Sequence, residues 1–253
     1  MYKVIGIDEA GKGPVLGSMF IGFSIINLPN GLKEMNEYQE LLKKLGVKDS
    51  KKITPKKRNT IYQDLKQHMD IKYAQLTPAL IDQNNAAGGK LNELEIQAIV
   101  QILESEKPQL VIIDALTAKP DKFGDDILKR LSFECKIISE NKADDKYEIV
   151  GAASIIAKEL REQEMQQINI NVGKILSQVS KDSSQSADAE KSASEEASPD
   201  SNLVGSGYPA DPKTKAFLKE HYANKEFDFI FRKSWQTYKD LAGDSKQKTL
   251  NDF

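Results

Sequence analysis

Residues 4–19, VIGIDEAGKGPVLGSM, combine the pattern of a buried strand with a pair of acids and several glycines. The run up to Ile7 is short, apolar and rich in branched side chains, as in a buried strand. Asp8 and Glu9 follow at once, and an ionised carboxylate at the end of an apolar strand needs a metal ion, a partner charge or solvent. The stretch therefore predicts a strand that ends in a charged site.

The remaining sequence alternates strand-like and helix-like segments. GSMFIGFSIINL follows the glycines and favours a hairpin with the first strand. Apolar runs recur in IKYAQLTP, QLVIIDAL and FECKIIS, and segments with helical spacing include NEYQELLKKLG, TPKKRNTIYQDLKQHM, LNELEIQAIVQILESE and DDILKRL. Because helical segments alternate with the later strand-like segments, we expect these strands to pair in parallel. The sequence thus predicts an α/β architecture around a mixed sheet.

Composition excludes several classes of protein. The 253 residues are 39% hydrophobic and 29% charged, and no window approaches 18 uninterrupted apolar residues. The opening residues do not have the pattern of a signal peptide, so we expect a cytoplasmic protein. The single cysteine can build neither a disulfide within the chain nor a thiolate zinc site by itself.

Charge is unevenly distributed along the chain. The net charge is −2, but residues 181–201 hold six acidic and two basic residues, so the rest is about +2. Basic residues cluster in 48–58 and again in 231–239. These clusters could face phosphates, or they could be solvated faces of helices and loops.

Acids recur at the ends of other predicted strands. Asp114 ends VIID, and Asp144 lies in the polar turn after CKIIS, beside Asp145. Any one of them could be a helix cap or a solvated turn residue. In open α/β sheets, however, ligands gather at the carboxyl ends of the strands. We therefore expect Asp8, Glu9, Asp114 and Asp144 to converge.

Such a cluster of oxygen ligands indicates hard cations. No histidine or cysteine motif accompanies the acids, which favours Mg²⁺ or Mn²⁺ over zinc. Two such ions can activate water and stabilise the leaving oxygen during in-line attack on a phosphodiester. Neighbouring strand residues point to opposite faces, so Asp8 and Glu9 share one site only if the strand ends or bends there.

Five motifs together resemble ribonuclease HII, particularly its single-chain archaeal form. They are IGIDEAGKGPVLG (5–17), DSKK (49–52), VIIDAL (111–116), NKADDKYEIVGAASIIAK (141–158) and GSGYPADPKT (205–214). The resemblance implies an RNase H-like fold, with a mixed five-stranded sheet flanked by helices and a C-terminal helical part. It also implies metal-dependent endonucleolytic cleavage of RNA in RNA/DNA hybrids and at ribonucleotides embedded in duplex DNA. The products would carry 5′-phosphate and 3′-hydroxyl ends, and the role would be ribonucleotide excision and RNA primer removal.

The resemblance also assigns residues. Asp8, Glu9, Asp114 and Asp144 match the catalytic, metal-binding acids of the family. The resemblance implies that they bind two ions of Mg²⁺ or Mn²⁺. Substrate contacts would come from the following residues: Gly11, Lys12, Gly13, Lys51, Lys52, Lys142, Lys158 and Tyr208. The backbone of the glycine element would recognise the ribose 2′-hydroxyl, the group that distinguishes RNA from DNA. Lys12 departs from the more usual arginine.

The sequence predicts four parts of the chain. We expect a catalytic domain at 1–174, a disordered Ser/Ala/acid-rich insert at 175–203, and a helical part at 204–241 that completes the substrate groove. Residues 242–253 would form a flexible tail. Within it, Gln247, Leu250 and Phe253 have the spacing of a sliding-clamp-binding peptide, although a frayed terminus is the simpler interpretation. The predicted partners are nucleic acid and a sliding clamp, no membrane is expected to bind, and the protein is expected to be a monomer.

Two other functions remain open at this point. One is a catalytically silent protein that binds RNA/DNA hybrids through its basic segments and Tyr208. The other is a different RNase H-fold nuclease, such as a resolvase, which would share the acid cluster but have no use for a 2′-hydroxyl reader.

Overall fold

The computed structural model describes residues 1–47, 53–115, 117–184 and 202–251. The chain divides into two compact units. The first unit comprises Met1–Lys12, Met19–Leu76 and Ala87–Arg161, and the second comprises Gly13–Ser18, Thr77–Ala86 and Glu162–Phe253. The main segment of the second unit begins at Glu162, before the boundary expected after residue 174, and this unit also includes two short segments from early in the chain.

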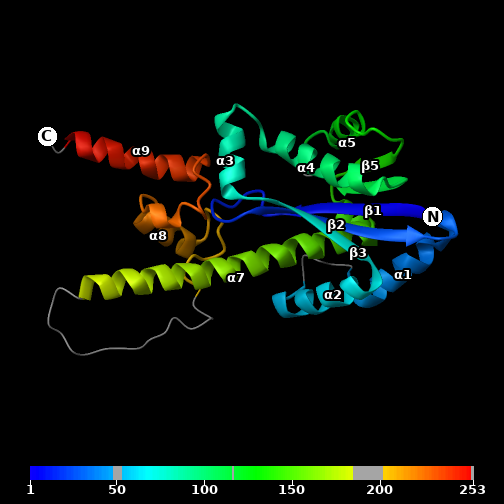
Figure 1. The fold of residues 1–253 in the computed structure, drawn as a ribbon, viewed down its shortest axis with the longest axis horizontal. Coiled ribbons are helices and arrows are strands. Elements are labelled where there is room, and N and C mark those ends of the chain that lie inside the picture. Colours follow the sequence, from blue (N-terminus) through cyan, green and yellow to red (C-terminus); the bar gives the residue numbers. More distant parts are fainter. Residues whose placement is uncertain (48–52, 116, 185–201, 252–253) are drawn as a thin grey trace. The chain divides into compact units, whose positions relative to one another are not determined.

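A mixed sheet forms the centre of the first unit (Figure 1). In the described residues its five strands are β1 (Tyr2–Ala10), β2 (Met19–Leu28), β3 (Asp70–Leu76), β4 (Leu110–Asp114) and β5 (Lys136–Glu140). Their order is β3-β2-β1-β4-β5. β2 pairs antiparallel with β1 and β3, whereas β4 pairs parallel with β1 and β5. The predicted mixed sheet is confirmed, and the carboxyl ends of β1, β4 and β5 lie at the same edge.

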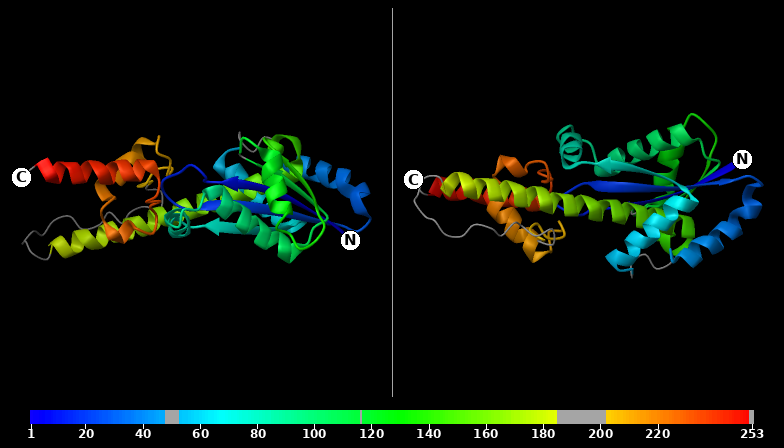
Figure 2. Two further views of the ribbon diagram at one scale, coloured as in Figure 1. Left: turned by 90° about the horizontal axis from the view of Figure 1, so that it is seen from above. Right: turned by 60° about the horizontal axis from the view of Figure 1, so that its bottom comes forward.

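Helices cover both faces of this sheet. One face packs against α1 (Met35–Leu45), which follows the 3₁₀ turn η1 (Gly31–Glu34), and against α2 (Pro55–His68) and the start of α7 (Glu148–Ser184). The views in Figures 1 and 2 show α4 (Leu91–Glu106) and α5 (Pro120–Leu128) on the other face. Val4 belongs to the apolar cluster on the α7 side. Because side chains alternate along a strand, Asp8 faces α7 and Glu9 faces α4.

Two glycines bring α7 into direct contact with the sheet. A Cβ atom on Gly6 would lie 2.4 Å from the Ile149 carbonyl oxygen, and one on Gly22 would lie 2.5 Å from that of Ala153. Neither position has room for a side chain, so both glycines are required by the close approach of the helix backbone. The contact fixes the next turns of α7 beside the end of β1.

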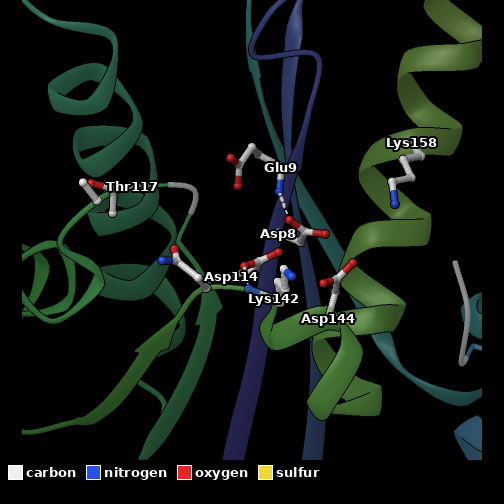
Figure 3. Close-up of a pocket in the computed structure, with 9 residues that line it drawn as sticks. Asp8, Glu9, Asp114, Thr117, Lys142, Asp144 and Lys158 are labelled. Atoms are coloured by element: carbon white, nitrogen blue, oxygen red, sulfur yellow. Dashed lines mark hydrogen bonds between the residues drawn. The ribbon is translucent and has the colours of Figure 1, made fainter. Parts of the chain in front are cut away.

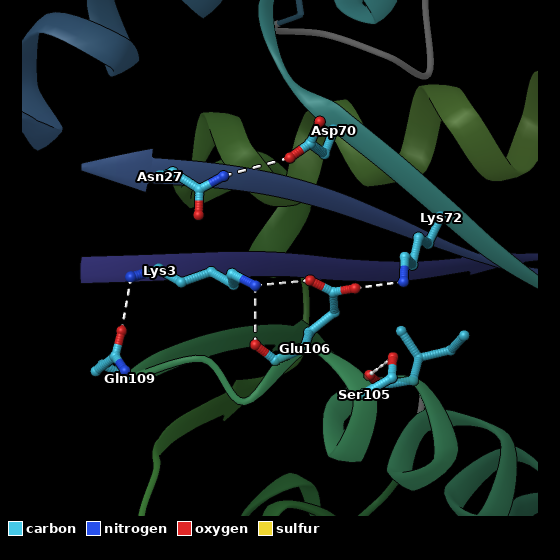
Figure 4. Close-up of polar contacts among 8 residues, drawn as sticks. Lys3, Asn27, Asp70, Lys72, Ser105, Glu106 and Gln109 are labelled. Carbon is cyan, nitrogen blue, oxygen red and sulfur yellow. Dashed lines mark hydrogen bonds and ion pairs between the residues drawn. The ribbon is translucent and has the colours of Figure 1, made fainter. Parts of the chain in front are cut away.

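Side chains at helix ends explain where several elements start and stop. Thr54 caps α2 by accepting from the Lys57 N–H, and Gly46 ends α1 in the left-handed conformation. At the end of α4, Glu106 accepts from Lys3 Nζ at 2.8 Å and pairs with Lys72 (Figure 4). These contacts tie α4 to β1 and β3.

The second unit is helical. It contains α3 (Pro78–Ala86), the later part of α7, α8 (Pro212–His221), the 3₁₀ turn η3 (Lys225–Phe227) and α9 (Gln236–Asn251). Its apolar cluster joins α7 and α8 to the loop residues Val15 and Leu16. The N–H groups of both loop residues donate to the Gly207 carbonyl oxygen, at 2.8 and 3.3 Å. The GPVLGS segment is thereby held against the GSGYP motif.

Two helices extend further than the sequence predicted. α7 continues to Ser184, so the first ten residues of the expected insert are helical, and Ile175 and Leu176 pack against the apolar cluster of the second unit. α9 continues to Asn251 through most of the expected tail, where lysine, glutamine and leucine are good helix formers. Residues 185–201 lie outside the described residues. In the described part of the chain, no helix has the length and apolar character needed to cross a membrane.

Candidate active site

Asp8 is the most buried acid at the edge where the parallel strands end. It lies on β1, is 6% exposed, and accepts a hydrogen bond from the Glu9 N–H at 2.7 Å. On the α7 side it accepts a hydrogen bond from Ser154 and faces the charge of Lys158. Figure 3 shows Lys158 extending from α7 toward the hollow beside Asp8.

Asp114 and Asp144 join Asp8 from two other segments. Asp114 ends β4, and Asp144 lies in the short helix α6 (Ala143–Lys146) after β5. The N–H of Lys142 donates to Asp114 Oδ1 at 2.8 Å, which links the two segments. One carboxylate oxygen from each of Asp8, Asp114 and Asp144 can be chosen so that all three lie within 4.8 Å of one another. The expected convergence is confirmed for these three acids.

Glu9 lies on the opposite face of β1 from Asp8. β1 continues to Ala10 without ending or bending at Asp8, so the two neighbouring side chains point to opposite faces of the strand. Figure 3 shows their carboxylates directed to different sides of β1. Glu9 lines the same hollow, of about 640 Å³, but it is not part of the three-acid group.

Burial makes ionisation of this site costly. Burial raises the pKa of Asp8 to about 7; the hydrogen bond from Ser154 opposes that rise, and the nearby charge of Asp114 adds to it. The pKa of Glu9 is raised well above its ordinary value, first by burial and then by the carboxylates of Glu95 and Asp8. Nearby negative charges that are taken out of water favour the binding of a cation.

The donor set fits a hard divalent cation. All the ligands available in the group are carboxylate oxygens, which Mg²⁺ and Mn²⁺ prefer. Glu9 Oε1 is buried and accepts no hydrogen bond from the described residues. A buried carboxylate oxygen that accepts no hydrogen bond is open to a further ligand, and a cation would supply it.

Comparison with known proteins identifies the family. The family model described as Ribonuclease HII matches residues 5–191. The chain is 38% identical to ribonuclease HII of Thermococcus onnurineus, over 94% of this chain and 89% of that protein. It is 35% identical to ribonuclease HII of Pyrococcus abyssi, over 99% of this chain and 97% of that protein. The chain belongs to the ribonuclease HII family.

Solved structures agree with this assignment. The crystal structure of ribonuclease H2 from Pyrococcus horikoshii matches with a TM-score of 0.74 and 34% identity, covering 96% of this chain and 98% of that one. The ribonuclease HII in a complex with PCNA from Archaeoglobus fulgidus matches with a TM-score of 0.71 and 27% identity, covering 92% of this chain and 95% of that one. As a ribonuclease HII, the protein is an RNase H endonuclease, and this family depends on divalent metal. The predicted RNase H-like fold is confirmed.

Six of the eight predicted substrate residues of this ribonuclease HII fall into three groups, while Gly11 and Lys12 follow β1 in the first unit. Lys142 and Lys158 line the hollow with the acids. Lys51 and Lys52 lie outside the described residues. In the second unit, the Tyr208 ring is 45% exposed, and a Cβ atom on Gly13 would lie 3.7 Å from it. Gly13 and Tyr208 are therefore neighbours, although 195 positions separate them.

Sequence reasoning missed two residues of the ribonuclease HII site. Ser154, on α7, supplies a hydrogen bond to Asp8. Glu95, on α4, is 2% exposed and accepts from Lys12 Nζ at 2.7 Å. The available signal for Glu95 was an acid between the apolar residues Leu94 and Ile96, which breaks the polarity pattern of the helix.

Proposed function

We propose that Asp8, Glu9, Asp114 and Asp144 bind the catalytic metal, as two Mg²⁺ or Mn²⁺ ions. The observation that carries the proposal is the meeting of three carboxylates from β1, β4 and α6 within 4.8 Å. When bound, such ions activate the attacking water and stabilise the leaving 3′-oxygen, so that hydrolysis leaves 5′-phosphate and 3′-hydroxyl ends. Burial supports this role because carboxylates taken out of water favour a bound cation as a partner.

The protein's own groups position the ligands and the nucleic acid. Asp114 is oriented by the N–H groups of Lys142 and Ala143, at 2.8 and 3.4 Å. Lys142 and Lys158 border the acids, and their ammonium groups would neutralise phosphates beside the cleaved bond. The four acids would thus bind metal while the lysines bind the nucleic-acid backbone.

Recognition of the ribose would depend on the glycine element. The backbone of Gly11, Lys12 and Gly13 would exchange hydrogen bonds with the 2′-hydroxyl, the group absent from DNA. Tyr208 would pack on the sugar at the junction between RNA and DNA. The proximity of Gly13 to Tyr208 supports this pairing of roles. Lys51 and Lys52 would contribute further phosphate contacts.

Cleavage assays test the proposal. The purified protein is incubated with Mg²⁺ or Mn²⁺ and three labelled duplexes: an RNA/DNA hybrid, a DNA duplex with one ribonucleotide, and all-DNA. We expect the first two to be cut and the third to stay intact. Asp8→Asn and Asp144→Asn are each expected to lower kcat by about a thousandfold or more, since each removes an anionic metal ligand.

Asp145→Asn provides the matched control. Asp145 is adjacent to Asp144 but exposed, so we expect its variant to retain the wild-type kcat. Binding of the hybrid without cleavage would favour the catalytically silent alternative. Equal cleavage of all three duplexes, or cleavage retained by Asp8→Asn, would contradict the proposed function.

A second proposal concerns the partner and the setting. We propose that residues 247–253 bind a sliding clamp and that the enzyme works as a cytoplasmic monomer in ribonucleotide excision and primer removal. The complex of the Archaeoglobus fulgidus relative with PCNA supports the clamp as partner. Gln247 and Leu250 lie in α9, where side chains are not described, and Phe253 is outside the described residues.

A further inference from the structure

The ammonium group of Lys12 lies between two buried carboxylates on the α4 side of β1. Lys12 Nζ is 2.7 Å from Glu95 Oε2 and 3.7 Å from Glu9 Oε1. The Glu95 and Glu9 side chains are 2% and 6% exposed, and that of Lys12 is 20% exposed. Both carboxylates therefore compete for one cation that solvent screens only weakly.

The position of Glu95 is fixed by the helix that carries it. α4 is held at its end by Glu106, which contacts Lys3 and Lys72 (Figure 4). Its first turn is held by Glu93, which accepts from both terminal nitrogens of Arg130 at 2.6 and 2.9 Å. Glu95 also lies among apolar residues of the helix. It is therefore a rigid acceptor, and Lys12 is the flexible member of the pair.

We infer that Glu95 is a positioning residue that holds the Lys12 ammonium away from Glu9 and so keeps the Glu9 carboxylate available to the divalent cation. The inference rests on the proposed function, because it takes Glu9 as a metal ligand. Without the charge of Glu95, the Glu9 carboxylate, whose Oε1 is 3.7 Å from Lys12 Nζ, still attracts the ammonium. The ammonium then moves toward Glu9 Oε1, the buried oxygen that accepts no hydrogen bond within the described residues, and competes with the metal for it.

Direct measurement of metal binding tests this inference. Mn²⁺ alone is titrated calorimetrically, without nucleic acid, into the wild type, Glu95→Gln, Lys12→Met and the double variant. Outer-sphere partners typically affect metal affinity by 10–100-fold, so we expect Glu95→Gln to weaken Mn²⁺ binding by roughly tenfold or more. In the Lys12→Met background the same substitution should have little effect, because the competing ammonium is gone.

Two further variants complete the design. Glu104→Gln removes a partly exposed carboxylate near the other end of the same helix, where it accepts from Ser132, and should bind Mn²⁺ as the wild type does. Glu95→Asp keeps the charge but shortens the side chain, so it should weaken Mn²⁺ binding less than Glu95→Gln does. If Glu95→Gln does not fold, Glu95→Asp is used in its place. Lys12→Met alone should bind Mn²⁺ no more weakly than the wild type.

Three results would overturn the inference. The first is that Glu95→Gln binds Mn²⁺ with the wild-type affinity. The second is that Glu95→Gln weakens Mn²⁺ binding equally in the wild-type and Lys12→Met backgrounds. The third is that Lys12→Met alone binds Mn²⁺ more weakly than the wild type. Equal weakening would mean that Glu95 acts on the metal through its charge alone. Asp8→Asn separates this inference from the proposed function: if it also bound Mn²⁺ normally, the proposed ligand set would be wrong.

Discussion

The backbone N–H of Lys142 donates to Asp114 Oδ1 at 2.8 Å, and Lys142 has a φ of 60°. This left-handed residue lies between β5 and α6. Its conformation turns the chain so that one N–H orients Asp114 while Asp144 follows two residues later. One backbone turn thus sets the geometry of two acids from different segments.

Lys142→Gly should therefore change stability little, whereas Lys142→Pro should lower it. Glycine adopts a positive φ without the cost of roughly 1–2 kcal/mol that other residues bear, so we expect the free energy of unfolding to stay within about 1 kcal/mol of the wild type. Proline fixes φ near −65° and has no N–H, so a loss of about 3 kcal/mol is expected. Urea denaturation in EDTA measures both changes. Equal destabilisation by the two substitutions would contradict the assigned role of the turn.

Asp8→Asn should stabilise the metal-free protein above neutral pH. The folded-state pKa of Asp8 is about 7, above its ordinary 3.8, so the folded chain holds this proton more tightly than the unfolded chain. Ionisation then costs stability as pH rises from 3.8 to about 7. An asparagine does not ionise, and we expect a gain on the order of 1 kcal/mol or more at pH 8 in EDTA.

The pH dependence of that gain provides the control. At pH 4 the wild type and Asp8→Asn should differ little, because the folded-state carboxyl is protonated. Added Mg²⁺ should raise the Tm of the wild type at pH 8 and have less effect on the variant, which lacks one charged ligand. If the variant were less stable than the wild type at pH 8 in EDTA, buried charge would not be the dominant cost at this position.

Much of this site could be predicted from the sequence because its acids are local signals at strand ends. Asp8, Asp114 and Asp144 each follow an apolar run, and parallel strands bring such ends together. The face of Glu9 stayed open at the level of the sequence because it depends on where the strand ends. In the structure the strand runs on to Ala10, and alternation separates Glu9 from Asp8. The pairing of Lys12 with Glu95 spans 83 positions, and it depends on where α4 packs rather than on any local pattern.

The glycines of the first motif should divide into two kinds on substitution. Gly6→Ala would place a Cβ atom 2.4 Å from the Ile149 carbonyl oxygen, so we expect about 3 kcal/mol of destabilisation or no soluble protein. Gly13→Ala meets only the Tyr208 ring at 3.7 Å, which is ordinary contact. We expect it to fold with a Tm near that of the wild type but to cut the single-ribonucleotide duplex more slowly. Thermal denaturation and the cleavage rate separate the two kinds.

Removal of residues 247–253 should abolish clamp binding and leave cleavage unchanged. A clamp-binding peptide inserts aliphatic and aromatic side chains into an apolar pocket, and Leu250 and Phe253 would supply them, whereas the acids lie in the first unit. The measurement is calorimetric titration of an archaeal sliding clamp into the full chain and the truncated chain. Leu250→Ala with Phe253→Ala should reproduce the loss, while Lys248→Ala, between the anchor positions, should bind with little change. Clamp binding that persists after truncation would mean that the contact lies elsewhere on the protein. Slower cleavage of a short duplex by the truncated chain, measured without the clamp, would mean that the tail contributes to catalysis.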